Sequence, residues 1–463
     1  MNKLVIAALP ISASIVSLLY YAFTRSAEEL IFVFVLCYWL GLGGVLLVSK
    51  RSRPATRRSL ALYFSAAFAI NVVVTVLNAT EFEADPASNG EPFRHTPDFS
   101  FDDWAYHQVG IDVSDDLIEG RGFDLDDIRS RYSYIGYPIV LGIEYYLSDW
   151  FGGRHPLVPR IFNSLIGAWL VIAIYYLARI IYGRRVAKIA ASISLLFPAF
   201  WFYSSVTVRD ILAALLVTLI AIYSVRLLRP NRYGGQWLDV SLFVAASLGL
   251  YYLRAPMIFV VWGGVALFLL SRRNVSVQIK AVYGVVALAA SIGVYLFMVG
   301  EGGDVERLAS YREQYEDLVS IEASSSSLAV RYIHSAPPPF NYILSYIFAI
   351  FAPIPPVRQA TLPGYIEAAG AVVWYMVIPA WIMGSWMALK QYKARLLFIL
   401  QFMIILSIAL TSINIRHKIQ FFPLGIVLAA NYIFYKPERY IKATVVFGVI
   451  LTGSFLVYKI IKG

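Results

Sequence analysis

The sequence predicts an all-α protein that crosses a membrane about thirteen times. Hydrophobic residues make up 59% of its 463 residues, and charged residues make up only 15%. Apolar runs of roughly 17–25 residues recur along the chain, and a helix of that length crosses the ~30 Å hydrocarbon core of a bilayer. Because a helix satisfies its own backbone hydrogen bonds, repeated apolar runs favour a polytopic helical protein over a soluble fold.

The apolar runs are expected to be transmembrane helices in the order in which they occur. They cover residues 4–23, 29–48, 59–78, 157–181, 187–206, 211–228, 239–253, 256–271, 278–299, 366–389, 395–414, 419–435 and 443–459. The first run has no convincing small-residue cleavage site, so we interpret it as a span and not as a signal peptide.

Basic residues gather in the connections between these runs. The clusters are Lys50–Arg58, Arg184–Lys188, Arg226–Arg232, Arg272–Lys280, Lys390–Arg395 and Lys436–Lys442. Cytoplasmic loops are enriched in Lys and Arg, so all of these clusters are expected in the cytoplasm and the alternate connections outside it, as in a multi-pass protein of the inner (plasma) membrane. The net charge of +10 is therefore explained by topology and contact with membrane lipids, and nucleic acid is not an expected partner.

The chain is expected to form one transmembrane domain, residues 1–463, with two large extracytoplasmic loops. The first loop covers residues 79–156, and its short aromatic segment 134–152 is predicted to lie along the membrane surface. The second loop covers residues 300–365. Within it, residues 340–356 are apolar but bracketed by prolines, which break helices, so this segment is predicted to be an interfacial or re-entrant element.

The first loop concentrates negative charge. Fourteen of the 29 acidic residues lie between Glu81 and Asp127. Asp102 and Asp103 stand apart because aromatic residues surround them, which favours a packed segment over a solvated one. A carboxylate there could act as a general base or hold a divalent cation, or the pair could simply be solvated. The sequence leaves the need for a metal open.

Three cationic features are predicted to share the outer side with this loop. Arg209-Asp210 separates two apolar runs. Either both residues face a cavity, or Arg209 lies at the membrane interface and Asp210 is the N-cap of the following helix. Arg254 interrupts two apolar runs and either reaches lipid headgroups or binds an anion. Arg416-His417-Lys418 runs against the positive-inside bias, which favours a phosphate site, although a tolerant turn is the alternative.

Several function classes are excluded or disfavoured. No phosphate-binding P-loop, HExxH zinc site or Gly-x-Ser-x-Gly elbow occurs, so ATP hydrolysis is not expected. The single cysteine, Cys37, excludes an intrachain disulfide and a cysteine-based metal cluster. His155 and His334 are isolated in the sequence and are expected to be structural.

The order of several motifs resembles the GT-C superfamily of integral-membrane glycosyltransferases, in particular the family 39-like branch of protein mannosyltransferases and aminoarabinose transferases. The resemblance covers mainly residues 95–215 and 416–430. Its motifs are Asp102–His107, Tyr134–Leu141, Arg160–Gly167, Leu177–Arg179 with Tyr182-Gly183, Phe197–Asp210 and Arg416–Pro423. The family carries an aromatic residue where this chain has His417.

The resemblance implies a sugar transfer on the extracytoplasmic face, from a polyprenyl-phosphate-linked donor to an envelope glycan, a glycolipid or a protein, with inversion at the anomeric carbon. It implies that Asp102 or Asp103 is the catalytic base. Arg416, Lys418 and Arg254 would bind the donor phosphate. Tyr106, His107, Arg209, Asp210 and His417 would support the site.

Two alternatives remain. One is a polymerase or ligase of lipid-linked oligosaccharides, which typically relies on arginine-rich outer loops. The other is not an enzyme but a transporter or flippase for a lipid-linked sugar, which should place ionisable residues near the middle of the bilayer. The acidic loop and the position of the charges at the outer ends of the spans favour the transferase.

Overall fold

The structure is a computed structural model, and it describes residues 27–50, 52–83, 100–125, 128, 135–150, 154–227, 236–271, 336–337, 339–351, 362–411 and 415–462. Helices and short turns account for these residues, and no strand occurs among them, which confirms the predicted all-α fold class. The elements are α2 (Ala27–Val48), α3 (Pro54–Glu83), α4 (Ser100–Ile118), α6 (Gly136–Asp149), α7 (Leu157–Tyr182), α8 (Arg184–Leu195), α9 (Pro198–Ser204), α10 (Asp210–Leu227), α11 (Gln236–Leu270), α15 (Phe340–Phe351), α16 (Leu362–Lys390), α17 (Tyr392–Thr411), the 3₁₀ helix η2 (Ile415–Gln420), α18 (Phe422–Tyr435) and α19 (Pro437–Lys462).

Six of the described helices, namely α3, α7, α10, α11, α16 and α17, are long and apolar enough to cross a membrane. Helices α8 and α9 together would make a seventh span, bent by 60°. Shorter apolar stretches occur in α2 and α18. The predicted spans 4–23 and 278–299 lie outside the described residues, so the total of thirteen stays a prediction.

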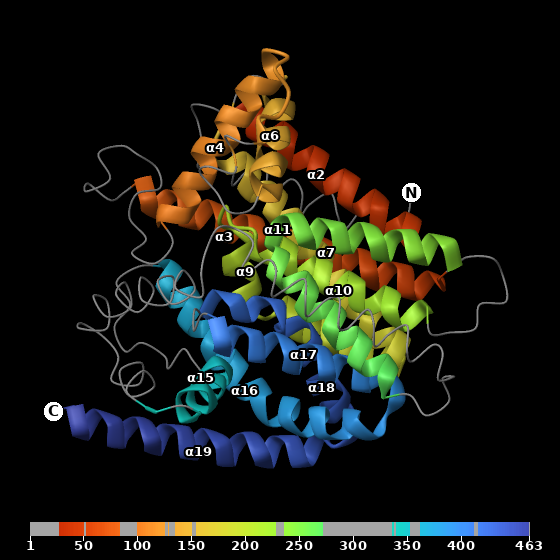
Figure 1. Cartoon of the computed structure of the whole chain (residues 1–463), viewed down its shortest axis with the longest axis vertical. Helices are drawn as coiled ribbons and strands as arrows, with labels where there is room; N and C mark the ends of the chain where they lie inside the picture. The colour runs from red at the N-terminus through yellow and green to blue at the C-terminus, as the bar shows by residue number, and fades with distance from the viewer. Residues whose placement is uncertain are drawn as a thin grey trace.

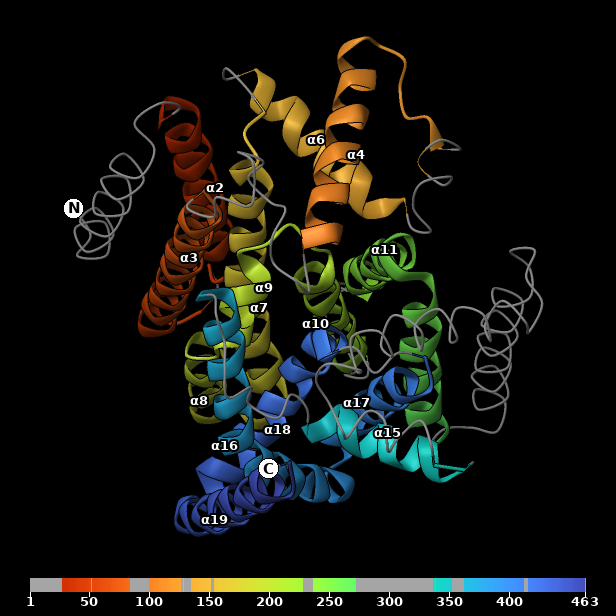
Figure 2. The ribbon, with the colours of Figure 1, turned by 90° about the vertical axis from the view of Figure 1, so that its left-hand side faces the viewer.

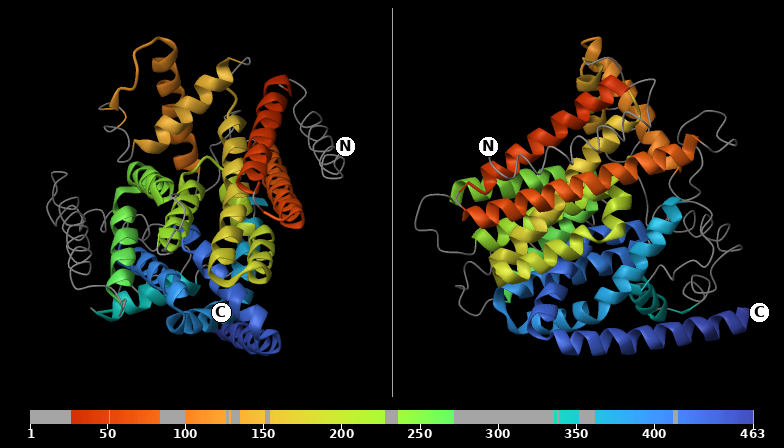
Figure 3. Two further views of the ribbon diagram at one scale, coloured as in Figure 1. Left: turned by 90° about the vertical axis from the view of Figure 1, so that its right-hand side faces the viewer. Right: turned by 180° about the vertical axis from the view of Figure 1, so that it is seen from behind.

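Two of the basic turns lie at the same end of the helix bundle. In Figures 1 and 3, the turn between α2 and α3 and the turn between α16 and α17 lie at one end of the bundle, and α4 lies toward the other. These two turns carry the basic clusters around Arg57 and Lys393. The chain therefore separates its basic turns from the segment that carries Asp102 and Asp103, which is the separation that the positive-inside rule requires.

Helix boundaries have local causes. Helix α7 ends at Gly183, whose φ of 94° is a left-handed conformation that glycine adopts without strain. Helix α9 begins with Pro198 at its first position, where the missing N–H costs nothing. Helix α11 contains a break at Arg254, with φ −164° and ψ 76°, two residues before Pro256. The two halves of α11 run in different directions (Figure 2) and match the two predicted runs 239–253 and 256–271.

The core is continuous and largely aromatic on both sides of α7. Phe64 stacks on Phe68 with 6.1 Å between ring centroids, and both side chains are fully buried. On the other side, Phe197 meets the ring of Phe422 edge-on at 4.9 Å. A Cβ on Gly384 would lie 2.1 Å from the carbonyl oxygen of Leu428, so only glycine allows α16 and α18 to approach this closely.

Helices α4 and α6 pack on each other beside α11 (Figure 2). Gly136 allows the start of α6 to approach α11 closely, because a Cβ at this position would lie 2.8 Å from the backbone carbonyl of Tyr252. The start of α6 is thereby fixed against the residues that precede the Arg254 break. Helix α15, the predicted interfacial or re-entrant segment, has 12 residues and packs on α17. At 1.5 Å per residue it spans about 18 Å, too short to cross a bilayer.

Candidate functional site

The helix that carries Asp102 and Asp103 is held in place by two aromatic contacts. The ring of Tyr106 in α4 meets the ring of Tyr137 in α6 edge-on, with centroids 4.9 Å apart and an interplanar angle of 89°. His107 Nδ1 and the hydroxyl group of Tyr145 share a hydrogen bond of 2.6 Å. Tyr106 and His107 are both buried. They therefore position α4 against α6.

Asp102 and Asp103 lie in the first turn of α4, one turn before Tyr106, and their side chains lie outside what the structure describes. Tyr106 belongs to a buried cluster with Tyr137, Leu141 and Leu253, against which Leu212 packs. Leu253 adjoins Arg254, and Leu212 lies two residues after Asp210. The cluster thus links the turn of α4 that carries Tyr106 to the parts of α10 and α11 that carry these two charged residues.

Arg254 and Asp210 form an ion pair between the break in α11 and the start of α10. Arg254 Nη1 lies 3.3 Å from Asp210 Oδ1, and their side chains are 14% and 3% exposed. Arg209 Nη1 donates a hydrogen bond of 3.3 Å to the carbonyl oxygen of Leu253. Arg254, which is isolated in the sequence, thus has a carboxylate partner. Arg209 stabilises the backbone beside the break in α11 by binding the Leu253 carbonyl oxygen.

Asn163, in α7, is a central residue that sequence reasoning did not single out. Its Nδ2 donates to the Tyr137 hydroxyl group at 2.9 Å, to the Val206 carbonyl oxygen at 2.7 Å and, less closely, to the Val208 carbonyl oxygen at 3.3 Å. This one amide joins α6 to the segment that leads into Arg209 and Asp210. The sequence feature that could have identified Asn163 is its position in the run Arg160–Gly167, where a polar amide occurs inside a largely apolar helix.

A polar seam continues from Asn163 across α3, α7 and the end of α9. Asn71 Nδ2 donates to the Ser164 carbonyl oxygen at 3.2 Å, and Asn78 Nδ2 donates to the Ser205 hydroxyl group at 2.6 Å. The Ser164 hydroxyl group donates to the carbonyl oxygen of Ser204 at 3.3 Å. Buried hydrogen bonds of this kind are costly to break, so the seam fixes the segment 204–209 in one conformation.

The second predicted cationic feature forms η2. The structure describes the backbone of Arg416 but not its side chain, whereas His417 and Lys418 are 8% and 1% exposed. Lys418 Nζ donates to the Phe348 carbonyl oxygen in α15 at 3.4 Å. Burial lowers the pKa of Lys418 well below its ordinary value, and the nearby carboxylate of Glu367 opposes that shift. Because η2 packs on α10, which begins at Asp210, it lies at the same end of the bundle as the ion pair.

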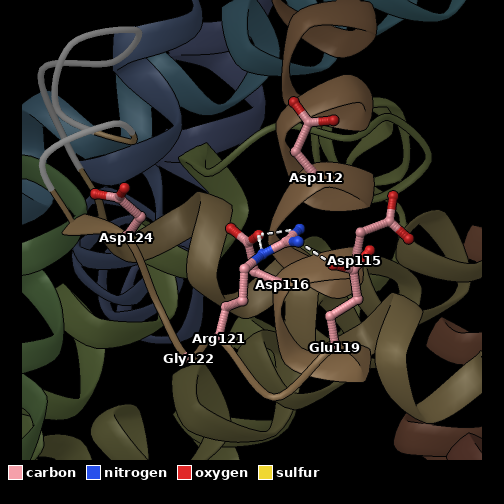
Figure 4. Close-up of a pocket in the computed structure, with 7 residues that line it drawn as sticks. All are labelled: Asp112, Asp115, Asp116, Glu119, Arg121, Gly122 and Asp124. Carbon is pink, nitrogen blue, oxygen red and sulfur yellow. Dashed lines mark hydrogen bonds and ion pairs between the residues drawn. The ribbon is translucent and has the colours of Figure 1, made fainter.

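The other carboxylates of α4 form a separate, solvent-facing acidic pocket beyond its far end (Figure 4). Its lining residues are Asp112, Asp115, Asp116, Glu119, Arg121, Gly122 and Asp124. Arg121 pairs with Asp116 at 2.8 Å and with Glu119, and Arg154 pairs with Asp115. Three of the five carboxylates of the pocket are therefore paired with arginines. Asp112 lies ten residues after Asp102, about 15 Å farther along a helix, so this pocket is separate from the ion-pair region.

Two titratable groups in or near α6 have shifted pKa values, namely the buried Glu144 and the half-buried His155. Burial raises the pKa of Glu144, in α6, well above its ordinary value. His155 Nδ1 accepts a hydrogen bond of 3.2 Å from the backbone N–H of Leu157, at the start of α7, and burial beside Arg160 lowers the pKa of His155 to about 4. Among the residues that the structure describes, no group of three His, Cys, Asp or Glu side chains is placed to hold a metal ion.

A family model described as dolichyl-phosphate-mannose-protein mannosyltransferase matches residues 150–297. The matched region includes α7 to α11, and with them Asn163, Arg209, Asp210 and Arg254. No curated protein matches the chain.

Solved structures show a weaker likeness. The archaeal oligosaccharyltransferase AglB from Archaeoglobus fulgidus, in complex with an inhibitory peptide and a dolichol-phosphate, is 14% identical, with a TM-score of 0.49, over 83% of this chain and 51% of that one. The apo form of the Archaeoglobus fulgidus oligosaccharyltransferase is 15% identical, with a TM-score of 0.45, over 81% and 51%. The chain spans about half the length of these proteins.

Proposed function

We propose that this chain, a member of the GT-C superfamily of integral-membrane glycosyltransferases, transfers a sugar from a polyprenyl-phosphate-linked donor to an envelope glycan, a glycolipid or a protein. The reaction takes place on the extracytoplasmic face of the inner membrane. The observation that carries the proposal is the buried cluster that Tyr106 shares with Leu253 and Leu212, because Tyr106 lies one turn after Asp102 and Asp103, and the two leucines lie within two residues of Arg254 and Asp210.

In this reaction an acceptor hydroxyl oxygen attacks the anomeric carbon of the donor sugar. The bond from that carbon to the phosphate oxygen breaks on the opposite side, so the configuration inverts. The proton of the acceptor goes to the carboxylate of Asp102 or Asp103, and the bonding electrons leave with the lipid phosphate. A carboxylate in a partly desolvated site is suited to this general-base role, and the phosphate leaving group supplies the activation that a nucleotide would otherwise provide.

The departing phosphate needs positive charge. Arg416 and Lys418 of η2 are the proposed main phosphate ligands, and Arg254 adds charge from across α10. A phosphate beside Lys418 would favour its charged form and so oppose the lowering of its pKa by burial. His417, which is buried on the same 3₁₀ helix, and Arg209, which holds the backbone at Leu253, keep these cations in place.

Different segments would recognise the acceptor and the donor. We assign the acceptor and the base to the loop 79–156, through α4 and α6, and the donor phosphate to η2. The loop 300–365 would contribute through α15, whose Phe348 carbonyl oxygen accepts from Lys418. This division predicts that acceptor recognition and donor recognition respond to different variants.

The test compares Asp102→Asn and Asp103→Asn with Asp112→Asn as the matched control on the same helix. Each variant is expressed in membranes at confirmed equal levels, and transfer from a polyprenyl-phosphate sugar is measured. One of the first two variants should lose about 10²–10⁴-fold in rate, the usual contribution of a general base. Asp112→Asn should stay near wild type because Asp112 lines the separate acidic pocket. Full activity in both Asp102→Asn and Asp103→Asn would reject the assignment of the base.

Transport of a lipid-linked sugar is the second candidate. The 60° bend between α8 and α9 and the break at Arg254 favour it, since transporters build substrate sites from broken helices. Purified protein in vesicles separates the two: a transferase joins sugar to acceptor when donor and acceptor are on the same side, whereas a transporter moves labelled donor across the bilayer without making a new bond.

A further inference from the structure

Two other elements, η2 and α16, hold the last turn of α15. Lys418 Nζ donates to the Phe348 carbonyl oxygen at 3.4 Å, and Trp374 Nε1 donates to the Ile350 carbonyl oxygen at 2.9 Å. The Tyr375 hydroxyl group donates to the carbonyl oxygen of the residue that follows, at 2.6 Å. The last carbonyl groups of a helix have no partners within it, so these side chains satisfy them. Lys418 and the first half of α16 therefore meet at one helix end.

Helix α16 runs in the same direction as the segment formed by η2 and α18. The ring centroid of Trp374 lies 5.6 Å from that of Phe421 and 4.7 Å from that of Phe422. Farther along, Gly384 in α16 packs against the carbonyl group of Leu428 in α18. Contacts therefore advance along both segments together. This direction brings the residues of α16 before Trp374 toward η2, which ends immediately before Phe421.

Glu367 is the carboxylate that this arrangement brings to Lys418. It precedes Trp374 by two helical turns, and residues two turns apart share one face of an α-helix. Glu367 is half-buried, whereas Lys418 is 1% exposed. The carboxylate acts electrostatically on the ammonium group and opposes the lowering of the Lys418 pKa by burial. The buried cation thus has a counter-charge from a different helix.

Carboxylates are scarce around Lys418 in the part of the chain that the structure describes. The elements that pack on η2 are α9, α10, α17 and α18, and α15 accepts its hydrogen bond. Asp210, in the first turn of α10, is the one carboxylate among their described residues, and it pairs with Arg254 at 3.3 Å. Glu367 is the one carboxylate of α16. Within these elements, Lys418 therefore depends on Glu367 for negative charge.

The other titratable groups near Lys418 do not replace this carboxylate. Arg416 and His417 precede Lys418 on η2, and a positive charge there disfavours a second one beside it. The remaining cations of the packed helices lie toward the basic turns and are Arg226, Lys390, Lys393 and Arg395. Tyrosine hydroxyl groups on these elements are neutral below about pH 9, and they include those of Tyr203, Tyr346 and Tyr375.

We propose, on the basis of the function proposed above, that Glu367 is a positioning residue of the donor site that keeps the Lys418 ammonium group charged for the donor phosphate. A buried lysine without a carboxylate nearby loses its proton more readily, and with it the charge that stabilises the phosphate. That charge matters most as the sugar leaves, because the phosphate then gains negative charge. Glu367 acts through Lys418 and does not touch the reacting atoms.

The experiment measures the binding of undecaprenyl phosphate to the purified full chain by microscale thermophoresis, from about pH 6 to about pH 9. This probe is the leaving group of the proposed reaction without the unidentified sugar, and undecaprenol, which lacks the phosphate, is the neutral control. The variants are Glu367→Gln, Glu367→Asp, Lys418→Met and the double variant of Glu367→Gln with Lys418→Met. Glu438→Gln, which removes an exposed carboxylate from α19, is the matched control.

The expected signature is a change in pH dependence. In Glu367→Gln, the affinity for undecaprenyl phosphate should begin to fall at a lower pH than in the unaltered protein, with a loss of about tenfold by about pH 8.5. Glu367→Asp keeps the charge and should recover most of this loss. Glu438→Gln should stay within about twofold, because its carboxylate is exposed. In the Lys418→Met background, Glu367→Gln should have no further effect, which separates a positioning role from a merely structural one.

Thermal unfolding without ligand tests the charge pair by itself. Because burial lowers the Lys418 pKa, the unfolded chain binds more protons above that pKa, and stability rises with pH there. Loss of the Glu367 charge lowers the pKa of Lys418 further. The rise in the unfolding midpoint should therefore begin at a lower pH in Glu367→Gln, and no such shift should occur in the Lys418→Met background.

The variants distinguish failure of the donor site from failure of the Glu367 role. Unchanged binding of undecaprenyl phosphate in Lys418→Met alone would overturn the donor role of Lys418, and the role of Glu367 with it. Weaker binding in Lys418→Met, with unaltered pH dependence in Glu367→Gln, would overturn only the role of Glu367. Tighter binding by Glu367→Gln at every pH would also overturn it, because the carboxylate would then act mainly by repelling the phosphate.

Discussion

Arg254 Nη1 lies 3.3 Å from Asp210 Oδ1, and this ion pair joins the break in α11 to the first residue of α10. The two residues are 44 positions apart in the sequence. Their side chains are largely buried, so each charge depends on the other for compensation. The pair therefore fixes the start of α10 against the break in α11.

The ion pair predicts strong coupling between its partners. Arg254→Met or Asp210→Asn alone should destabilise the protein by about 3 kcal/mol, because the remaining group is left buried without its counter-charge. The double variant should cost less than the sum. Thermal unfolding of the four proteins in detergent gives the double-mutant cycle. Strictly additive losses would contradict the coupling.

The Asn163–Tyr137 hydrogen bond predicts a positioning effect. Tyr137→Phe keeps the ring that supports Tyr106 but removes the acceptor of Asn163 Nδ2, so stability should fall by about 1 kcal/mol. Because Tyr137 acts through α4 on the acceptor side, kcat should fall while the KM for the lipid donor stays unchanged. Tyr146→Phe on the same helix is the control. A raised donor KM in Tyr137→Phe would contradict this role.

His155 predicts acid sensitivity. Its pKa is about 4 in the folded protein and near 6.5 when unfolded, so the folded state prefers the neutral ring. The stability that depends on this preference is present above pH 6.5 and is lost as pH falls from 6.5 toward 4, to a total of about 3 kcal/mol. Protonation would also remove the acceptor of the Leu157 N–H. His155→Asn should flatten stability between pH 6.5 and pH 4, as measured by unfolding midpoints.

Lys418 predicts a conflict between stability and function. Its pKa is lowered by burial, so between that pKa and about 10.4 the unfolded chain binds more protons and stability rises with pH. Lys418→Met should stabilise the protein at pH 7 and remove this slope. It should also weaken use of the phosphate-linked donor. A variant that is destabilised at pH 7 would show that Lys418 is held charged.

The topology can be checked with one cysteine. Gln391 lies in the turn between α16 and α17, next to Lys390. Cys37 is buried and is replaced by Ser in the background chain. Gln391→Cys should react with a membrane-impermeant thiol reagent from the cytoplasmic side only. Labelling from outside would overturn the orientation, and with it the shared face of η2 and α4.

Much of the fold was predictable because it depends on local patterns. The apolar runs predicted α3, α7, α10, α16 and α17, since a membrane helix needs length and hydrophobicity and little else. The sequence also separated residues 239–253 from 256–271 at Arg254, where the backbone leaves the helical conformation. The predicted span 187–206 was wrong in one respect, because the chain breaks before Pro198 into α8 and α9, which are bent by 60°.

The site was less predictable because its contacts join distant segments. Arg254 had no charged neighbour in the sequence, and its pairing with Asp210 arises only when α10 packs on α11. Asn163 resembled any polar residue in a membrane helix until Tyr137, Val206 and Val208 converged on its amide. Charge alone could not show which carboxylates of the acidic loop belong to the surface pocket around Arg121.

The sequence by itself determined that the chain is a helical membrane protein and where most of its long helices lie. Hydrophobicity, proline and glycine act locally, so these properties can be inferred from short stretches. Only the tertiary structure decided which charges meet. It separated the acids around Arg121 from the helix turn of Asp102 and Asp103, because packing of Tyr106 on Tyr137 and Leu253 directs one end of α4 toward the bundle and the other toward solvent.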